Sequence, residues 1–338
     1  MNIQQSEKQS ISKIIKNPPS LMKAAVFAGP NQIKIYSVEI PQPKKNQVRI
    51  KLQGCGICAS NLPVWQGREW FKYPLEPGYP GHEGWGIIDD VGDNVSEFKK
   101  GQRVAFLSDH SYCEYENVNS DAVVKLPDSL NKYPFLGEPF ACAMNILKRS
   151  ELQAGQKIAI IGIGFLGAML TSLAAQQGCE VIAISRRPFS LSVAKNKGAA
   201  HTILMENKYD IIKKVKELTN SSGCQRVIEA VGNQESIELA GELISIKGKL
   251  IIAGYHQDGL RKINMQVWNW KGIDVINAHE REMSVYLEGI RSAITAIEKG
   301  DFWPFDLLTN SYTIEQLPNA FEDMQKRPDG FMKAYLIF

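Results

Sequence analysis

The chain has 338 residues, of which 44% are hydrophobic, and its formal net charge is +3. This length can bury two cores, so we expect two domains. The weak charge, without blocks of like charge, argues against nucleic acid as a partner. The sequence shows neither a membrane-span-length apolar run nor the apolar core of a secretory signal, and its six cysteines suit a reducing compartment. We therefore expect a cytoplasmic protein without a membrane partner.

The N-terminal half begins with a polar leader and continues as short strands. Residues 1–21 are predicted to form a flexible tail. From Met22 to about Pro127, glycines and prolines punctuate short apolar runs, which is typical of a compact β domain of barrel type. The predicted strands cover residues 24–27, 33–38, 47–53, 86–91, 103–106 and 112–118.

Two motifs in this β region carry metal-ligating side chains. The first contains Cys55, Cys58 and Ser60, and the second is Gly81-His82-Glu83 followed by two further glycines. Thiolate, imidazole and carboxylate are the ligands of a catalytic zinc that keeps one position open. Only the fold can bring Cys58 to His82. Alternatively, Cys55 and Cys58 are a redox or zinc-knuckle pair, or His82 is a satisfied core histidine.

A glycine-rich run follows, between an apolar strand at 158–161 and an amphipathic helix. It contributes the predicted cofactor-binding residues Gly162, Gly164, Phe165, Leu166 and Gly167. In this context the glycines permit a tight turn and a close pyrophosphate, and the helix directs its N-terminal amides at that anion. A second apolar strand, at 181–184, follows at the spacing of a strand-helix-strand unit. The sequence therefore predicts a dinucleotide site.

The residues after this second strand decide the cofactor. NAD sites usually place a carboxylate here for the ribose hydroxyls, whereas NADP needs a cation for its 2′-phosphate. The chain instead has Ser185, Arg186 and Arg187, and two guanidiniums can bind a phosphate. We therefore predict a preference for NADP(H) over NAD(H). If the arginines are only a solvated loop pair, Ser185 alone does not discriminate between NAD(H) and NADP(H).

Alternating strands and helices continue to about residue 289. Strands are predicted near residues 201–204, 226–230, 249–253 and 274–278, and helices at 190–197, 209–219 and 234–244. This alternation is typical of a doubly wound parallel sheet of Rossmann type. A helix at 285–299 and an apolar closing strand should then return to the first domain. We predict a catalytic domain of residues 22–145 and 290–338, interrupted by a nucleotide domain of residues 146–289.

Together these motifs make the chain resemble the zinc-containing medium-chain dehydrogenase/reductase superfamily, in particular the alcohol and polyol dehydrogenases. The resemblance runs from Met22 to the C-terminus. It rests on the Cys58 loop, the motif at His82, the segments 93–95 and 100–104, the Glu138-Pro139 pair and the glycine-rich run. It implies an α/β fold in which a GroES-like catalytic domain of β-barrel type accompanies the Rossmann domain.

The resemblance also implies roles for individual residues. Cys58 and His82 would bind zinc, with Glu83 as a ligand or an exchangeable neighbour and Glu138 as a further or water-mediated contact. Ser60 would hydrogen-bond the substrate oxygen and relay its proton. Val231, Gly232 and Gly254 would approach the cofactor. The strand at 274–278 would pair between subunits, so we expect a homodimer or homotetramer.

The chain departs from the family pattern in three ways. Asn61 stands where an Asp often orients the zinc-bound histidine, so it would be an uncharged acceptor. Pro63 replaces a His that passes protons to solvent, so proton release must use another route. The lobe with four cysteines that holds a structural zinc is missing between Val104 and Cys113. We therefore predict one zinc per chain.

Several side chains keep two interpretations. Glu138 could be only a helix-start carboxylate, and Cys142 a substitute ligand or a buried filler. His110 and Cys113 could line the pocket or lie at the surface, and His256 could reach the nicotinamide or be an exposed loop residue. The sequence predicts a zinc-dependent dehydrogenase acting on a secondary alcohol or its ketone, in a polyol, sugar or cyclitol. The alternatives are a zinc-free NADPH-dependent quinone or enone reductase and a catalytically weak NADPH-binding sensor.

Overall fold

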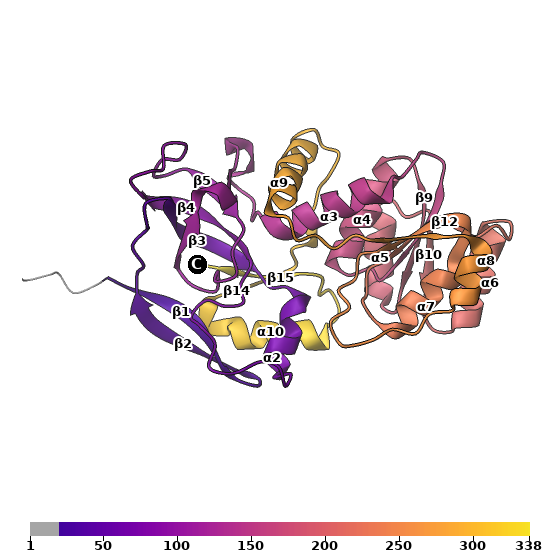
Figure 1. Ribbon diagram of the computed structural model, residues 1–338, viewed down its shortest axis with the longest axis horizontal. Helices are drawn as coiled ribbons and strands as arrows, with labels where there is room; N and C mark the ends of the chain where they lie inside the picture. Colours follow the sequence, from indigo (N-terminus) through magenta and orange to yellow (C-terminus); the bar gives the residue numbers. More distant parts are fainter. Residues whose placement is uncertain (1–19) are drawn as a thin grey trace, which may run out of the picture.

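The computed structural model describes residues 20–338, which form two large sheets, a two-stranded hairpin and the helices that join them (Figure 1). Of the predicted tail at 1–21, residues 1–19 lie outside the described part, and Leu21 already begins a strand. A hairpin of β1 (Leu21–Gly29) and β2 (Gln32–Glu39) opens the described chain.

The first large sheet holds the predicted N-terminal strands. Its order is β14-β15-β3-β4-β5-β7, and β6 also pairs with β3. The strands are β3 (Gln47–Gly56), β4 (Glu83–Val91), β5 (Arg103–Phe106), β6 (Tyr115–Asn119), β7 (Val123–Lys125), β14 (Asn310–Tyr312) and β15 (Ala334–Ile337). Strand β6 begins at Tyr115 rather than at 112, because Tyr112 and Cys113 lie in the preceding loop and pack their side chains in separate apolar clusters.

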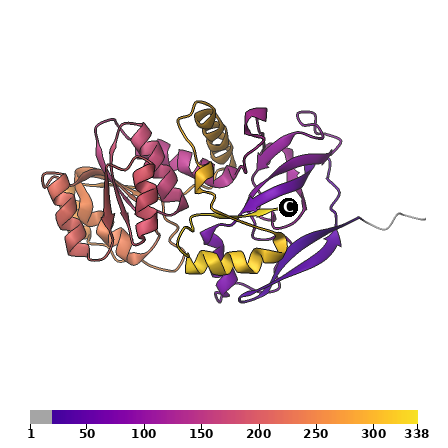
Figure 2. The same cartoon turned by 180° about the vertical axis from the view of Figure 1, so that it is seen from behind.

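The C-terminal segment returns to this first sheet. Strand β15 pairs antiparallel with β3, so the last residues lie beside strands formed by the first hundred. Figure 2 shows α10 (Leu317–Lys326) and β15 running back among the N-terminal strands. The return agrees in outline with the predicted insertion of the nucleotide domain, although the boundaries at 145/146 and 289/290 stay a prediction.

The second sheet is parallel and has the order β10-β9-β8-β11-β12-β13. Its strands are β8 (Lys157–Ile161), β9 (Glu180–Ser185), β10 (His201–Leu204), β11 (Cys224–Glu229), β12 (Ile244–Ile252) and β13 (Asp274–Asn277). Residues 158–161 and 181–184 are fully buried, which explains why both segments are continuous apolar runs. The chain order reverses between β8 and β11, and ligands bind at such a switch point in open α/β sheets.

Helices cover the parallel sheet and connect it to the first one. They are α2 (Leu62–Gln66), α3 (Gly137–Ser150), α4 (Phe165–Gln176), α5 (Pro188–Asn196), α6 (Lys208–Leu218), α7 (Gln234–Leu243), α8 (Met265–Lys271) and α9 (Met283–Glu298). The predicted helices at 190–197, 209–219, 234–244 and 285–299 are confirmed within two residues at each end. Helices α3 and α9 pack on each other between the two sheets (Figure 1). The predicted α/β architecture of a β-rich domain and a doubly wound sheet is therefore confirmed.

Candidate active site

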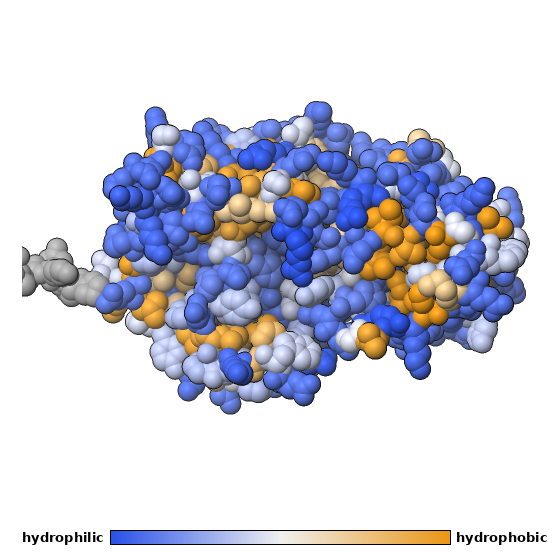
Figure 3. All heavy atoms as spheres, in the orientation of Figure 1, coloured by the Kyte–Doolittle hydropathy of each residue, from blue (hydrophilic) through white to orange (hydrophobic). Residues whose placement is uncertain are grey.

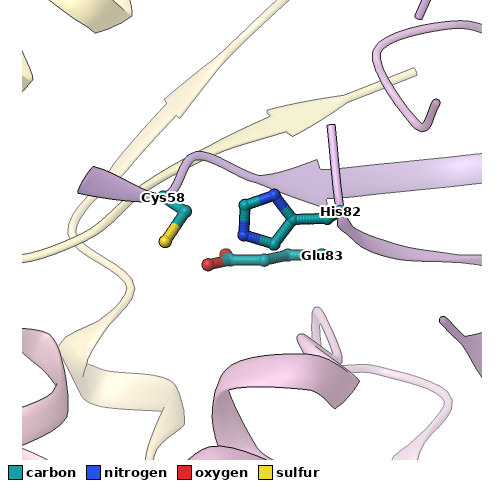
Figure 4. Close-up of side chains that lie close together, drawn as sticks. All are labelled: Cys58, His82 and Glu83. Atoms are coloured by element: carbon teal, nitrogen blue, oxygen red, sulfur yellow. The ribbon is translucent and has the colours of Figure 1, made fainter. Parts of the chain in front are cut away.

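Three of the four predicted metal ligands meet where β3 ends and β4 begins. Cys58 follows β3, His82 precedes β4, and Glu83 is the first residue of β4. In the antiparallel register Gly56 lies opposite Glu83, so the end of β3 lies beside the start of β4. The ligand atoms of Cys58, His82 and Glu83 all lie within 4.8 Å of one another, and Figure 4 shows the three side chains converging. We call these three residues the metal cluster.

A backbone carbonyl fixes the orientation of His82. Its Nδ1 lies 3.0 Å from the carbonyl oxygen of Pro80, which can only accept, so Nδ1 carries a proton and Nε2 is the nitrogen that a metal would bind. The expectation that Asn61 accepts from His82 is wrong. Asn61 Nδ2 instead donates to the same Pro80 oxygen and to Tyr112 Oη, each at 3.0 Å. Asn61 therefore supports the histidine only through the carbonyl that both residues share.

The charges around His82 favour a cation. Burial by itself would lower the pKa of His82, but the negative charges of Cys58, Glu138 and Glu83 outweigh it and raise this pKa to about 10. A buried imidazole is protonated so easily only where anionic groups are in excess. The donor set, the short separations and this negative surplus all fit a zinc ion.

Lys333, which the sequence analysis did not identify, reaches the metal cluster from the C-terminal segment. Its Nζ lies 2.7 Å from Oε1 and 2.6 Å from Oε2 of Glu83, and both residues are buried. Burial lowers the pKa of Lys333, but Glu83, Cys58 and Glu138 raise it above its usual value. The only sequence signal was one lysine inside the apolar run 331–337. A metal bound to Glu83 would share that carboxylate with the ammonium.

Glu138 and Ser60 lie near the metal cluster without belonging to it. Glu138 is at the start of α3, where it accepts a hydrogen bond from Cys142 Sγ at 3.1 Å, and burial raises its pKa. It is close enough to His82 to influence the pKa of that residue. Ser60 Oγ lies 3.1 Å from Cys58 Sγ, so a hydroxyl stands beside the thiol. The roles of both residues stay predictions.

The glycine-rich run forms the turn between β8 and α4 as the motif requires. Gly162 has a φ of 94°, and a Cβ on Gly167 would lie 2.0 Å from the Gly162 oxygen, so neither position accepts a side chain. A Cβ on Gly164 would meet nothing within 4 Å, which leaves open space beside the helix start. Helix α4 begins at Phe165, followed by Leu166, and no side chain of the described residues caps it. Its free amides and this space fit a pyrophosphate.

The loops after β11 and β12 carry the other predicted cofactor-binding residues. Glu229 is fully buried, and its Oε1 accepts from the backbone amides of Val231 and Gly232 at 2.7 and 2.8 Å. A Cβ on Gly254 would lie 2.3 Å from the Gly232 nitrogen, so the two loops touch. Of the two interpretations of His256, the exposed loop residue is wrong, because its Nε2 lies 2.9 Å from Glu229 Oε2 in a partly buried contact. A contact with the nicotinamide stays a prediction.

The residues after β9 occupy three different environments. Ser185 is buried and its hydroxyl accepts from the Arg187 amide at 3.4 Å, whereas Arg186 is exposed. Arg187 is partly buried, and its guanidinium donates to the carbonyl of Phe331. The interpretation of these arginines as a plain solvated pair therefore fails for Arg187, which is held by a residue of the C-terminal segment.

Four further side chains, those of Cys55, Cys113, His110 and Pro63, lie in different environments. Cys55 and Cys113 are buried in apolar clusters, so both are packed thiols. His110 lies between Glu76 and Asp109 on a partly exposed loop. Pro63 lines a cleft of about 160 Å³ that also touches Val231, Gly232 and Asp258, at the carboxyl end of the parallel sheet.

Comparison with protein families agrees with this geometry. A family model described as an alcohol dehydrogenase GroES-like domain matches residues 44–133, and one described as a zinc-binding dehydrogenase matches residues 166–291. The fold and the site together therefore define a protein with a GroES-like domain and a zinc-type dehydrogenase nucleotide domain.

Individual relatives extend the match over nearly the whole chain. The sorbitol dehydrogenase of Bacillus subtilis is 30% identical over 336 residues, covering 90% of this chain and 94% of the relative. The quinone oxidoreductase of Sus scrofa is 28% identical over 317 residues, covering 90% and 93%. The crystal structure of 2R,3R-butanediol dehydrogenase from Bacillus subtilis superposes with a TM-score of 0.81 at 23% identity, covering 94% of this chain and 99% of that one.

The chain belongs to the zinc-containing medium-chain dehydrogenase/reductase superfamily, and within it to the zinc-type alcohol and polyol dehydrogenase family of oxidoreductases. Among residues 20–338, no helix combines the length and apolarity that crossing a membrane requires.

Proposed function

We propose that this protein is a zinc-dependent dehydrogenase that transfers hydride between NADP(H) and a secondary alcohol or its ketone, in a polyol, sugar or cyclitol. The observation that carries the proposal is the metal cluster, in which a thiol, an imidazole and a carboxylate lie within 4.8 Å of one another. When bound, zinc supplies Lewis acidity at the substrate oxygen and the nicotinamide exchanges the hydride. Sorbitol dehydrogenase as a relative favours a polyol substrate.

The chain's own residues have distinct tasks in this proposal. Cys58 and the free Nε2 of His82 hold the metal, and the Pro80 carbonyl keeps that imidazole in the correct tautomer. Glu83 and Glu138 supply the remaining oxygen contacts. Ser60 Oγ, which lies 3.1 Å from Cys58 Sγ, relays the proton: it accepts the hydroxyl proton of the substrate as it gives up its own. Pro63 has no proton to pass on, so the proton would leave by way of the cleft that Pro63 lines.

The nucleotide region supports the cofactor part of the proposal. Gly162, Gly164, Phe165, Leu166 and Gly167 hold the pyrophosphate, and Ser185, Arg186 and Arg187 the adenosine ribose with its 2′-phosphate. Val231, Gly232 and Gly254 approach the nicotinamide half.

We also propose an oligomeric state and a cellular location for the protein. Apolar side chains gather over the outer part of the parallel sheet, where β12 and α8 lie (Figure 3), and β13 ends the sheet with Val275 exposed. This edge would pair two copies into a homodimer, or two such pairs into a homotetramer. All six cysteines are free, which fits the cytoplasm.

Assays with both substrate classes test the function. We expect the protein, purified without chelators, to reduce NADP⁺ with sorbitol, butanediol or related polyols, and to lose this activity when zinc is removed and regain it when zinc returns. The quinone oxidoreductase relatives make the zinc-free reductase the second candidate. Quinone reduction by NADPH that survives zinc removal would establish that candidate, and NADPH binding without any turnover would indicate a sensor.

A further inference from the structure

Three arginines from distant parts of the sequence gather at the carboxyl end of β9. Arg186 and Arg187 follow the strand directly, whereas Arg327 ends α10 in the C-terminal segment. Arg327 has a left-handed backbone with a φ of 49°, and its Nε donates to the carbonyl of Met324 at 3.4 Å. We call these three residues the arginine cluster.

A hydrogen bond between the two regions holds the arginine cluster together. Arg187 donates to the carbonyl of Phe331, 144 residues away in sequence, and its guanidinium carbon lies 5.6 Å from the ring centre of Phe189. The Phe331 amide donates to the Pro328 carbonyl at 3.0 Å, which closes a tight turn directly after Arg327. The turn that carries Arg327 is therefore fastened to the end of β9.

Among the described residues no carboxylate forms an ion pair with the arginine cluster, and Asp329 acts on Arg187 only from a longer distance. Desolvation and then the charge of Arg186 lower the pKa of Arg327. Desolvation and Arg327 lower the pKa of Arg187, although Asp329 partly opposes that shift. In the described part of the chain the ion-paired arginines are Arg49 and Arg261, and no carboxylate lies within 4.0 Å of any guanidinium of the arginine cluster. Guanidiniums that gather without an ion-paired carboxylate can bind a multiply charged anion.

We propose that Arg327 is the third guanidinium of the 2′-phosphate site of NADP(H), so that residues from both ends of the chain distinguish NADP(H) from NAD(H). The inference rests on the proposed NADP(H) preference and adds a specificity residue outside the glycine-rich fold unit. Arg187 has two tasks, since it binds the phosphate and positions the turn that carries Arg327. A phosphate monoester on the adenosine ribose is the ligand class.

Binding of two adenosine fragments tests the inference without zinc or turnover. Calorimetry compares 2′,5′-ADP with 5′-AMP on the full chain, because the fragments differ only in the 2′-phosphate. Arg327→Asn removes the guanidinium at a position where Asn tolerates the left-handed backbone. Lys326→Ala is the matched control, since it removes one positive charge from the neighbouring exposed residue, which pairs with Glu322 instead.

We expect Arg327→Asn to weaken 2′,5′-ADP by about tenfold or more, the usual size for one charge-assisted hydrogen bond, and to leave 5′-AMP unchanged. Lys326→Ala should keep the wild-type preference. If Arg327→Asn also keeps that preference, or weakens both fragments equally, Arg327 is not part of the site although NADP(H) remains preferred. If the wild type binds both fragments alike, the NADP(H) preference itself is wrong and the inference fails with it.

Discussion

The metal cluster and the arginine cluster hold charged groups in opposite ways. In the metal cluster, the buried Glu83 faces the buried Lys333, and His82 is fixed by a carbonyl. In the arginine cluster, charges of one sign stand together, and Arg186 is exposed to solvent. Removing one side chain of the Glu83–Lys333 pair should therefore destabilise the fold, because it leaves a buried charge unpaired. Removing one arginine of the arginine cluster should only weaken ligand binding.

The different exposure of the two clusters also predicts a different response to salt. Exposed charges more than about 10 Å apart are largely screened at 0.1 M salt, and buried pairs are screened much less. Salt should thus reduce the discrimination between NADPH and NADH and have little effect on the Lys333 pair.

Loss of the Ser60 hydroxyl should have the largest effect on turnover. If Ser60 relays the substrate proton, Ser60→Ala lowers kcat by about 10²–10⁴-fold, the usual contribution of a positioned proton-transfer group. Zinc content should not change, because Ser60 only neighbours Cys58. Steady-state kinetics with elemental analysis measures both quantities, and Ser60→Thr, which keeps a hydroxyl, is the control. An unchanged kcat in Ser60→Ala would remove this role.

The next largest effect concerns the buried ion pair. Lys333→Met leaves Glu83 without its cation and should lower the free energy of unfolding of the zinc-depleted protein by about 3–5 kcal/mol. The double variant with Glu83→Gln should recover most of this loss. Urea unfolding measures the difference, and a single variant as stable as the wild type would contradict the account. If Lys333→Met loses less unfolding free energy when zinc is bound, Glu83 is a metal ligand.

Glu116 differs from Glu83 because it is a buried carboxyl that forms no ion pair within the described residues. Burial raises its pKa from 4.5 to about 7, although the hydroxyls of Ser108 and Ser111 and the charge of His110 oppose the shift. The folded protein then holds this proton more tightly than the unfolded chain. Stability should therefore fall as pH rises from about 4.5 to about 7, by up to about 3 kcal/mol.

Urea unfolding at several pH values tests this prediction. Glu116→Gln keeps the shape of the side chain and cannot ionise, so the difference in stability between wild type and variant should change over that pH range. A difference that stays constant from pH 4.5 to 7 would show that Glu116 does not titrate there.

The smallest effect is expected at the exposed part of the arginine cluster. Arg186→Ala should weaken NADPH by about 10–100-fold and leave NADH unchanged, because only NADPH carries the 2′-phosphate. Added salt should reduce the wild-type preference. Fluorescence titration of both nucleotides measures the affinities, with Lys195→Ala on the exposed end of α5 as the control. Equal losses for both nucleotides would contradict the assignment.

Local patterns explain which features the sequence could predict. The run 158–161 reads as a buried parallel strand because apolar side chains cover both of its faces, and the structure confirms it. Cys58, His82 and Glu83 were predictable as ligands by their chemical type, and the register of β3 against β4 supplies the contact.

Contacts between distant segments explain what the sequence could not predict. Lys333 lies 250 residues from Glu83, and Phe331 lies 144 residues from Arg187, so no spacing rule connects either pair. His82 was assigned the wrong acceptor, Asn61, because the Pro80 carbonyl, a backbone group, has no sequence signal.

Zinc content per chain tests the central claim most directly. Elemental analysis of protein purified without chelators should find about one zinc in the wild type and none in Cys58→Ala. Cys55→Ala, which removes the packed thiol three residues earlier, should retain the metal. A wild type without zinc, or zinc retained in Cys58→Ala, would contradict the metal cluster as the catalytic centre.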